Sequence, residues 1–230
     1  MKVVILAGGF GTRISEYTKT IPKPMIKING KPLIMYIIDH YVSYGHKEFY
    51  IALGYKGNII KKYFQNYKNS KIKINFIETG LKTMTGGRIK RLGKFLKGET
   101  FLATYGDGIS NVDLKKLVKF HQKSKKLVTL TAVRPPARFG TIKLNRNKVS
   151  YFKEKSSLDE GWINGGFFVI NSKFLRFIKN DNTFLEREPF ELLTRKNQLA
   201  GYRHKGFWQC MDTLRDKVIL EKKIKQKNFE

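Results

Sequence analysis

Cysteine and acidic residues are scarce in this sequence of 230 residues. The single cysteine, Cys210, excludes an intramolecular disulfide and any metal site built from several cysteines. Aspartate and glutamate together number 18 against 46 lysines and arginines, which gives a formal net charge of +28. No apolar run approaches the roughly 20 residues that a bilayer crossing needs, and Met1 leads into a strand pattern and not a signal peptide. We therefore expect a cytoplasmic protein without a membrane-spanning segment.

Residues that commonly carry nucleophilic or metal catalysis are also few. The four histidines, at positions 40, 46, 121 and 204, have no metal-ligand spacing, and no Gly-x-Ser-x-Gly motif is present. Cys210 lies close to Trp208 and Met211, which favours a buried packing thiol over a nucleophile. The sequence therefore argues against an enzyme that forms a covalent intermediate on serine or cysteine.

The strong positive charge points to anionic partners, among which nucleic acid is the first to consider. Most of the basic residues are lysines spread along the chain, and only residues 222–227 form a compact basic tail. A dedicated nucleic-acid binder usually concentrates arginine and exposed aromatic residues in one segment. A nucleic-acid-binding protein built on a nucleotide-binding fold remains the alternative from a different class, and the dispersed lysines argue against it.

Apolar segments alternate with helical patterns along the first half of the chain. Hydrophobic residues make up 41% of the sequence and aromatic residues 13%, enough for a substantial core. Strands are predicted at 3–6, 49–53, 72–77, 101–104 and 127–133, and helices at 33–44, 58–67, 88–96 and 113–121. This alternation predicts an α/β fold with a doubly wound, mostly parallel, Rossmann-like sheet.

The pattern changes after Pro136. Short strands are predicted at 140–144, 149–152 and 167–170, and helices at 173–178, at 189–196 and from about residue 212. We expect this part of the sheet to be mixed or antiparallel. Since no linker or internal repeat is evident, residues 1–230 are interpreted as one domain with two parts, about 1–133 and about 134–230.

A glycine-rich loop follows the first predicted strand, in the sequence from Ala7 to Arg13. Such a loop at the carboxyl end of a strand lets backbone N–H groups approach a phosphate closely, although a simple tight turn fits the pattern equally well. Its spacing matches neither the dinucleotide fingerprint nor the triphosphate loop of common ATPases. Lys23 lies between Pro22 and Pro24, whose fixed φ angles direct its side chain. Arg13 and Lys23 together would neutralise a polyphosphate leaving group.

Two aspartates complete this candidate site. Asp107 follows a predicted strand and is flanked by glycines, so its carboxylate is expected at the same sheet edge as the phosphate loop. Asp212 lies at a predicted strand-to-helix junction, where it is either a second ligand for Mg²⁺ or a helix cap. The pair suits a magnesium ion bound between carboxylates and phosphates.

These motifs resemble the sugar-phosphate nucleotidylyltransferases over nearly the whole chain. Two segments look like the superfamily signature, and four others look like the cytidylyl branch of the family. The two signature segments are residues 6–13 and 23–25, and the four branch segments are 84–88, 104–108, 163–168 and 206–209.

The resemblance implies that a phosphate oxygen of a sugar 1-phosphate, most closely glucose 1-phosphate, attacks the α-phosphorus of CTP. The products would be CDP-glucose and pyrophosphate, and the required cofactor Mg²⁺. Because the substrate brings its own nucleophile, this agrees with the lack of an activated serine, cysteine or histidine. The same chemistry with UTP or dTTP, or with another phosphorylated acceptor, remains open, since contacts to a base can be made largely by backbone.

The resemblance also assigns roles to individual residues. Arg13, Lys23 and Asp107 would act on the reacting phosphates, and Asp107 and Asp212 would bind Mg²⁺. The nucleotide would contact Leu6, Ala7, Gly8, Gly9, Gly11, Thr12, Arg13, Lys23, Thr83, Thr85, Gly86, Arg88 and Asp107. The sugar phosphate would contact Glu154, Lys155, Asn164 and Gly165; a surface ion pair is the less favoured alternative for Glu154 and Lys155.

Some segments depart from the family pattern. Only residues 65–73 fill a connection that is longer in the family, and Ser156 and Cys210 stand where prolines are usual.

We expect a homo-oligomer in which residues 1–133 bind the nucleotide and residues 134–230 bind the sugar phosphate.

Overall fold

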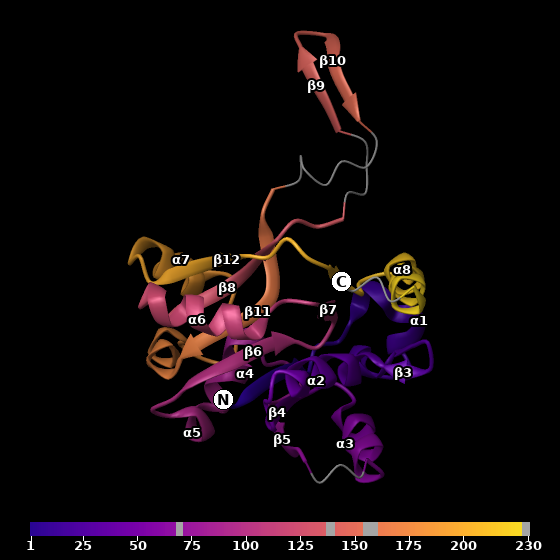
Figure 1. Cartoon of the computed structure of the whole chain (residues 1–230). Helices are drawn as coiled ribbons and strands as arrows, with labels where there is room; N and C mark the ends of the chain where they lie inside the picture. Colours follow the sequence, from indigo (N-terminus) through magenta and orange to yellow (C-terminus); the bar gives the residue numbers. More distant parts are fainter. Residues whose placement is uncertain (68–70, 137–140, 154–160, 227–230) are drawn as a thin grey trace.

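A central seven-stranded sheet organises the molecule (Figure 1). The computed structural model describes residues 1–67, 71–136, 141–153 and 161–226. The strand order is β12-β8-β11-β6-β1-β4-β5. The strands are β1 (Val3–Ala7), β4 (Glu48–Leu53), β5 (Lys73–Glu78), β6 (Thr100–Tyr105), β8 (Val128–Val133), β11 (Ile163–Asn171) and β12 (Leu199–Arg203).

The sheet is parallel in its first half and mixed in its second. Strand β1 pairs in parallel with both β4 and β6, and β4 pairs in parallel with β5. Strand β11 runs antiparallel to β6 and β8, whereas β12 returns parallel to β8. The predicted mostly parallel α/β sheet with an antiparallel C-terminal part is confirmed, and β12 is a strand that the sequence analysis missed.

Strand β1 is buried on both faces, which explains its continuous apolar sequence. Val3 and Ile5 pack into one hydrophobic cluster, while Val4 and Leu6 pack into another. Helices α2 (Leu33–Ser43), α3 (Gly57–Gln65) and α6 (Leu114–Ser124) contribute to the first cluster. Helices α4 (Thr85–Arg91), α5 (Gly93–Leu96) and α7 (Glu188–Arg195) contribute to the second. Both faces of the sheet are therefore covered, as the doubly wound pattern predicts.

The remaining elements are short or lie at the edges. They are α1 (Ser15–Thr18), α8 (Leu214–Lys225), the 3₁₀ helices η1 (Thr12–Ile14), η2 (Lys23–Met25) and η3 (Ser172–Phe177), and the strands β2 (Lys27–Ile28), β3 (Lys31–Pro32), β7 (Gly108–Ser110), β9 (Thr141–Asn145), β10 (Lys148–Lys153) and β13 (Trp208–Cys210). Among the described residues, no helix is both long and apolar enough to cross a membrane.

Two predicted helices have different forms in the structure. The helix predicted at 88–96 begins earlier, at Thr85, and is interrupted at Leu92, whose N–H is shared among the carbonyls of the preceding turn. The segment predicted as a helix at 173–178 is the 3₁₀ helix η3. Its N-cap, Asn171, accepts a hydrogen bond from the N–H of Lys173.

Strands β9 and β10 form an antiparallel hairpin outside the main body of the molecule (Figure 1). Four apolar side chains are paired across it, Ile142 with Phe152 and Leu144 with Val149. Their exposed fractions lie between 49% and 66%. These apolar side chains of the hairpin therefore remain largely exposed to solvent.

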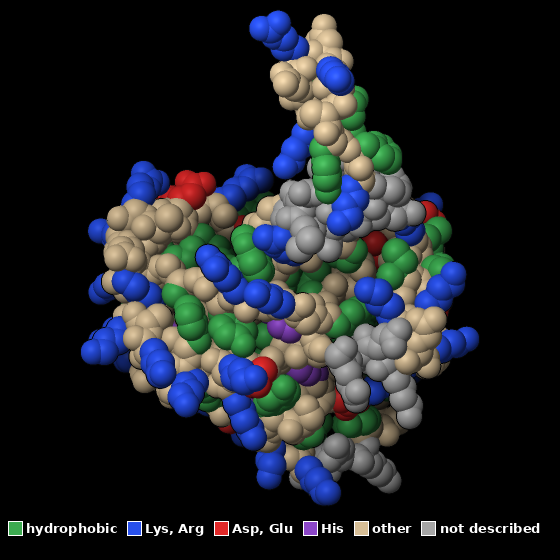
Figure 2. Space-filling view, turned by 45° about the horizontal axis from the view of Figure 1, so that its top comes forward, with side chains coloured by type: hydrophobic (Ala, Val, Ile, Leu, Met, Phe, Trp, Pro, Cys, Tyr) green, Lys and Arg blue, Asp and Glu red, His purple; other side chains and the backbone are tan. Residues whose placement is uncertain are grey.

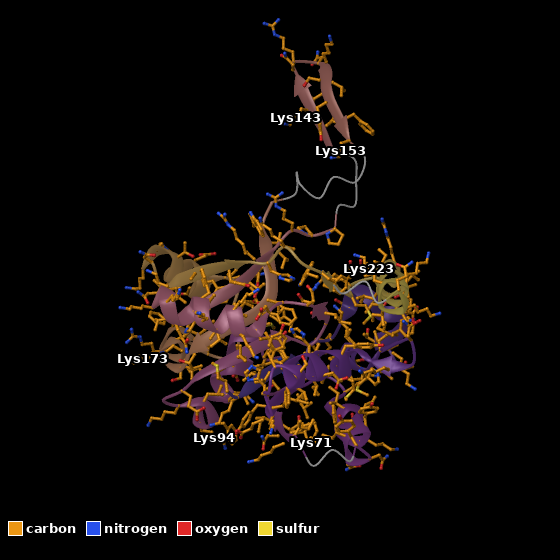
Figure 3. All side chains as sticks on the ribbon, in the orientation of Figure 1. Lys71, Lys94, Lys143, Lys153, Lys173 and Lys223 are labelled. Carbon is orange, nitrogen blue, oxygen red and sulfur yellow. The ribbon has the colours of Figure 1, made fainter. Side chains whose placement is uncertain are left out.

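The positive charge is distributed around the molecule. Figure 2 shows lysine and arginine side chains over the whole visible face, with few acidic side chains among them. Labelled lysines lie on widely separated elements, including Lys94 on α5, Lys143 on the hairpin and Lys223 on α8 (Figure 3). This distribution agrees with the dispersed lysines of the sequence.

Candidate active site

A cleft of about 380 Å³ opens at the carboxyl ends of β1 and β6. Its lining combines the glycine-rich loop, the lysine of η2 and the segment that leads into α4. Every residue predicted to bind the nucleotide lines this cleft except Gly86. The sequence analysis did not assign the other lining residues to the nucleotide, although five of them lie in its motif segments; they are Phe10, Pro24, Leu81, Lys82, Met84, Tyr105, Gly106 and Phe184.

The glycine-rich loop has little free space at one glycine and open space at the next. A Cβ atom on Gly8 would lie 2.2 Å from Nη1 of Arg88, whereas one on Gly9 would meet no atom within 4 Å. Gly11 has a φ of +66°, a conformation that favours glycine, and it precedes η1. The loop therefore needs glycine at position 8 for packing and at position 11 for its backbone conformation.

Arg88 binds the glycine-rich loop through the Gly8 carbonyl. Its guanidinium donates from Nη1 to Thr79 Oγ1 (2.7 Å), the Gly80 carbonyl (2.8 Å) and the Leu53 carbonyl (3.1 Å), and from Nη2 to the Gly8 carbonyl (2.9 Å). Burial lowers the pKa of this guanidinium. A fifth hydrogen bond, from Nη2 to the Leu81 carbonyl, is longer at 3.4 Å. Because these bonds join three separate segments, Arg88 positions the walls of the cleft.

Two cations and two carboxylates meet at one side of the cleft. The ammonium of Lys23 donates to Oδ2 of Asp107 at 2.8 Å and to Oδ1 of Asp212 at 2.6 Å. Nη1 of Arg13 donates to the other oxygen of Asp212 at 2.5 Å. The exposed fractions of the Lys23 and Asp212 side chains are 9% and 13%, while that of Arg13 is 72%. The structure thus brings together all four residues that the sequence analysis selected for the phosphates and Mg²⁺.

The electrostatics of this cluster keep its lysine charged. Burial by itself lowers the pKa of Lys23, but the carboxylates of Asp107 and Asp212 outweigh it and raise the pKa above its ordinary value. Nearby, burial and the same two carboxylates raise the pKa of the Cys210 thiol to about 12. This thiol is protonated at neutral pH, in agreement with its assignment as a packing residue.

Strand pairing explains how two aspartates so distant in sequence come together. Strand β13 pairs antiparallel with β7, with Cys210 opposite Gly108, and the N–H of Met211 donates to the carbonyl of Asp107 at 2.8 Å. Each aspartate lies directly beyond the end of its strand, Asp107 before β7 and Asp212 shortly after β13. The small two-stranded sheet therefore aligns the two carboxylates.

The helix cap beside Asp212 is Thr213. The Thr213 hydroxyl accepts the N–H of Asp216, and the Asp216 carboxylate accepts the N–H groups of Thr213 (2.9 Å) and Asp212 (3.0 Å). This capping box leaves the Asp212 side chain for Lys23 and Arg13. The alternative of Asp212 as the cap of α8 is thereby excluded.

The two carboxylates fit a magnesium ion in chemistry and placement. They already converge on one cation, the Lys23 ammonium, and they offer oxygen atoms only, the ligands that Mg²⁺ prefers. Within the described ranges, no group of three or more His, Cys, Asp or Glu could hold a metal. A metal here would therefore need ligands from substrate phosphates, as is usual for Mg²⁺ sites of this kind.

Gly86 serves packing in this structure and does not line the cleft. Its N–H donates to the carbonyl of Thr183 at 3.0 Å, and a Cβ atom would lie 2.7 Å from the same oxygen. The N–H of Gly87 donates to that carbonyl as well. The N-terminal turn of α4 therefore packs against residues 181–185, and of the four residues predicted from this segment to bind the nucleotide, Thr83, Thr85 and Arg88 line the cleft.

Glu186 is a polar residue beside the cleft that the sequence analysis missed. Its carboxylate accepts hydrogen bonds from Thr85 Oγ1 at 2.7 Å and from the Tyr105 hydroxyl. The Tyr105 hydroxyl also accepts from Asn164 Nδ2 at 3.2 Å. Burial and the Glu186 carboxylate raise the pKa of Tyr105. The side chain of Glu186 thus links the start of α4 to the end of β6 and, through Tyr105, to β11.

The residues predicted for the sugar phosphate are described only in part. Glu154 and Lys155 lie outside the described residues. The side chain of Asn164 accepts the N–H of Gly166 at 2.9 Å, and the Gly165 carbonyl accepts from Trp208 Nε1 at 2.7 Å. Asn164 therefore faces the cleft residue Tyr105, while Gly165 fixes the indole of Trp208.

The fold and this site together define an α/β protein with a cleft suited to phosphate groups at the carboxyl edge of its sheet. A family model described as nucleotidyl transferase matches residues 2–216. The chain belongs to the nucleotidyl transferase family, as the motifs indicated.

Close relatives extend along the whole chain. It is 44% identical to the glucose-1-phosphate cytidylyltransferase of Salmonella typhimurium, with 96% of this chain and 95% of the relative covered. It is 41% identical, with the same coverage, to a Bacillus subtilis protein named "Probable glucose-1-phosphate cytidylyltransferase". The crystal structure of HddC from Yersinia pseudotuberculosis complexed with GMP-PN has a TM-score of 0.77. It shares 24% sequence identity and covers 97% of this chain and 99% of its own, which supports the fold.

Proposed function

We propose that this chain transfers CMP from CTP to glucose 1-phosphate in the presence of Mg²⁺, giving CDP-glucose and pyrophosphate. The observation that carries the proposal is the cluster of Lys23, Arg13, Asp107 and Asp212 beside the glycine-rich loop. The names of the relatives described above support cytidine as the base and glucose 1-phosphate as the acceptor.

The proposed reaction needs no covalent enzyme intermediate. A phosphate oxygen of the sugar 1-phosphate attacks the α-phosphorus of CTP, and the bond from that phosphorus to the bridging oxygen of the β-phosphate breaks. Pyrophosphate leaves with the electron pair of the broken bond. Its developing negative charge needs fixed cations, and Arg13 and Lys23 are the two that line the cleft close to the carboxylates.

Asp107 and Asp212 are the residues proposed to hold Mg²⁺. When bound, this ion would neutralise phosphate charge and orient the α-phosphate for attack. The backbone of Leu6–Gly9, together with Thr83 and Thr85, is proposed to hold the base and ribose, since all of these residues line the cleft. Arg88 is assigned a positioning role because its hydrogen bonds go to the protein.

Pyrophosphate release tests the reaction directly. The purified protein is incubated with Mg²⁺, glucose 1-phosphate and each of CTP, UTP, dTTP, ATP and GTP in turn. We expect release with CTP and a fall of several orders of magnitude for Asp107→Asn, which keeps the side-chain shape but removes a charge. Lys97→Met, on an exposed residue before the start of β6, is the matched control with a remote charge removed.

The other outcomes each favour a different interpretation. Release with UTP or dTTP would keep the mechanism and change the base, while release only with another sugar phosphate would change the acceptor. No release with any pair, together with salt-sensitive binding to RNA, would overturn the enzyme proposal and favour the nucleic-acid-binding alternative.

We also propose that the chain forms a homo-oligomer through the β9–β10 hairpin. The apolar pairs Ile142–Phe152 and Leu144–Val149 stand outside the body, and a two-stranded hairpin is only marginally stable alone in water. A second copy would cover these side chains. Light scattering after size-exclusion chromatography should give a multiple of the monomer mass, and Phe152→Ser should reduce it. A monomeric mass for the unaltered protein would contradict this assembly.

A further inference from the structure

The four charged side chains at the cleft suggest how Mg²⁺ binding depends on the nucleotide. We propose that Lys23 and Arg13 act as internal counter-ions of Asp107 and Asp212 in the free enzyme, so that the divalent ion and these cations compete for the same carboxylate oxygens. The triphosphate would then draw both cations away and admit the metal. This inference rests on the proposed function, in which the two aspartates hold Mg²⁺.

The contacts leave few carboxylate oxygens for a metal. Lys23 takes one oxygen from each aspartate, at 2.8 and 2.6 Å, and Arg13 takes the remaining oxygen of Asp212 at 2.5 Å. Three of the four oxygens therefore already accept a charged hydrogen bond. The ammonium of Lys23 contacts both carboxylates, the two groups that would hold the metal ion.

The charges of the cluster cancel. Two carboxylates face one ammonium and one guanidinium, so these four side chains together present no net negative charge to an approaching divalent cation. The side chains of Lys23 and Asp212 are almost fully buried, so water screens their interaction weakly. A bare Mg²⁺ ion would have to lose part of its hydration shell and repel Lys23 at the same time.

A bound nucleotide would supply phosphate oxygens, which are both ligands for the metal and hydrogen-bond acceptors for Lys23 and Arg13. Lys23 and Arg13 line the same cleft as the glycine-rich loop, so phosphate oxygens bound there can accept their hydrogen bonds. Transfer of the two cations from carboxylates to phosphates would leave two negative carboxylates facing an anionic ligand. That arrangement binds a divalent ion strongly. Metal and nucleotide should therefore bind with strong positive coupling.

Two features keep the cluster in place until the nucleotide binds. Lys23 begins the 3₁₀ helix η2 and is flanked by Pro22 and Pro24, which restrict its backbone. Asp212 is fixed through its own N–H, which donates to the buried carboxylate of Asp216 at 3.0 Å. Arg13, with 72% of its side chain exposed, is the member that can leave most easily.

Mn²⁺ is a suitable probe because its free, hydrated form is counted directly by electron paramagnetic resonance. The purified full chain is titrated with Mn²⁺ alone, and then with Mn²⁺ plus a CTP analogue that carries a methylene group between the α and β phosphorus atoms. We expect weak binding to the unaltered protein alone and at least about tenfold tighter binding with the analogue, a typical size for coupling between two sites. Free analogue with Mn²⁺ is the blank.

Removing the Lys23 ammonium should strengthen Mn²⁺ binding, whereas an ordinary binding-site mutation weakens it. Lys23→Met should bind Mn²⁺ about tenfold or more tightly than the unaltered protein when no nucleotide is present, although its turnover falls. Arg13→Gln should show a smaller increase, and because this side chain is exposed it tests the same idea without risk to folding. Lys97→Met removes a charge from an exposed residue at the opposite end of β6 and should leave Mn²⁺ affinity unchanged.

The titration separates this inference from the proposed reaction. Equal Mn²⁺ affinity with and without the analogue, or no gain in either variant, would overturn the competition while leaving the pyrophosphate assay unaffected. If Asp107→Asn and Asp212→Asn do not weaken Mn²⁺ binding in the presence of the analogue, the aspartates are not the metal ligands, and both the competition and the proposed metal site are overturned. The proposed reaction is then judged by the pyrophosphate assay alone. A gain in Mn²⁺ affinity in Lys23→Met, together with no pyrophosphate release from CTP by the unaltered protein, would keep the competition and reject CTP as the substrate.

Discussion

The guanidinium of Arg88 lies directly against Gly8, and its Nη2 donates to the Gly8 carbonyl at 2.9 Å. An arginine from α4 therefore packs against the glycine-rich loop and holds it through a backbone carbonyl. The positions of the loop and of the start of α4 depend on each other. A side chain at position 8 would occupy the space of the guanidinium, since a Cβ atom there would lie 2.2 Å from Nη1.

Gly8→Ala and Gly9→Ala should differ in their effects on stability and on substrate binding. The alanine at position 8 displaces a guanidinium that makes five hydrogen bonds to the protein, so we expect the free energy of unfolding to fall by about 2 kcal/mol or more. A Cβ atom at position 9 meets no other atom, so Gly9→Ala should change the free energy of unfolding by less than about 1 kcal/mol. Urea unfolding measures both changes.

Gly9→Ala should instead raise KM for CTP. Its methyl group enters the cleft where backbone N–H groups would approach a phosphate. We expect an increase of about tenfold, equivalent to roughly 1.4 kcal/mol. Equal unfolding midpoints for the two variants would refute the packing argument, and an unchanged KM in Gly9→Ala would refute phosphate binding by the loop.

The sequence predicted the sheet and the charged cluster because both depend on strong local signals. A continuous apolar run such as Val3–Ala7 predicts a doubly covered strand, and a lysine held between two prolines is rarely an ordinary surface residue. The β12 strand was missed because Leu199–Arg203 has no such run and contains a glycine. Pairing with β8 makes it a strand, which is a tertiary effect.

Other parts of the site depend on contacts that the sequence does not reveal. Gly86 lies in a motif of the cytidylyl branch, and in the structure it packs against the Thr183 carbonyl, about 100 residues away along the chain. Glu186 follows a loop without any motif, and only the folded structure shows that its carboxylate meets Thr85 and Tyr105. An acidic residue just before α7 is the one local signal, and it equally predicts an ordinary helix start.

Glu186→Gln should impair the binding of both substrates with little loss of stability. The carboxylate accepts two hydrogen bonds, whereas an amide has only one oxygen to accept them. One of the two hydroxyls, each of which already accepts another hydrogen bond, must therefore reverse and accept from the amide N–H, which weakens the link between Thr85 and Tyr105. Because Tyr105 also contacts Asn164, we expect KM for CTP and for the sugar phosphate to rise about threefold to tenfold.

The kinetic pattern distinguishes this positioning role from a catalytic one. In Glu186→Gln the value of kcat should fall less than the ratio kcat/KM, and the unfolding midpoint should stay close to that of the unaltered protein. Glu188→Gln is the matched control, because Glu188 is exposed and its salt bridge is with Lys179. A change confined to kcat, or the same change in the control, would contradict the assignment.

His40 should make the protein less stable in mild acid. Burial lowers its pKa from 6.5 to about 4, although its Nε2 contacts the carbonyl of Val112 at 3.0 Å. Between these two pH values the unfolded chain binds a proton that the folded protein does not, so stability falls as pH decreases below about 6.5. A single group of this kind contributes roughly 2 kcal/mol of loss between about pH 7.5 and pH 5.

Urea unfolding of His40→Gln at the two pH values measures this contribution. Burial also lowers the pKa of His46, His121 and His204, so the variant should keep part of the acid sensitivity. We expect its loss of stability between the two pH values to be smaller than that of the unaltered protein by about 2 kcal/mol. If the free energy of unfolding depends on pH in the same way in the two proteins, His40 takes up its proton in the folded state as it does in the unfolded chain.

The net charge of +28 should make catalysis sensitive to salt. Both proposed substrates are anions, so a positive field raises their local concentration and their association rate, and salt screens this field. We expect kcat/KM for CTP to fall about tenfold between about 20 mM and about 500 mM NaCl, while kcat at saturation changes little. Lys82→Glu, on the rim of the cleft, should reduce kcat/KM at low salt more than Lys94→Glu, which lies on α5 away from the cleft (Figure 3). Equal effects of the two substitutions would mean that the total charge matters and its position does not. A kcat/KM that does not change with salt would mean that the positive charge has no role in substrate capture.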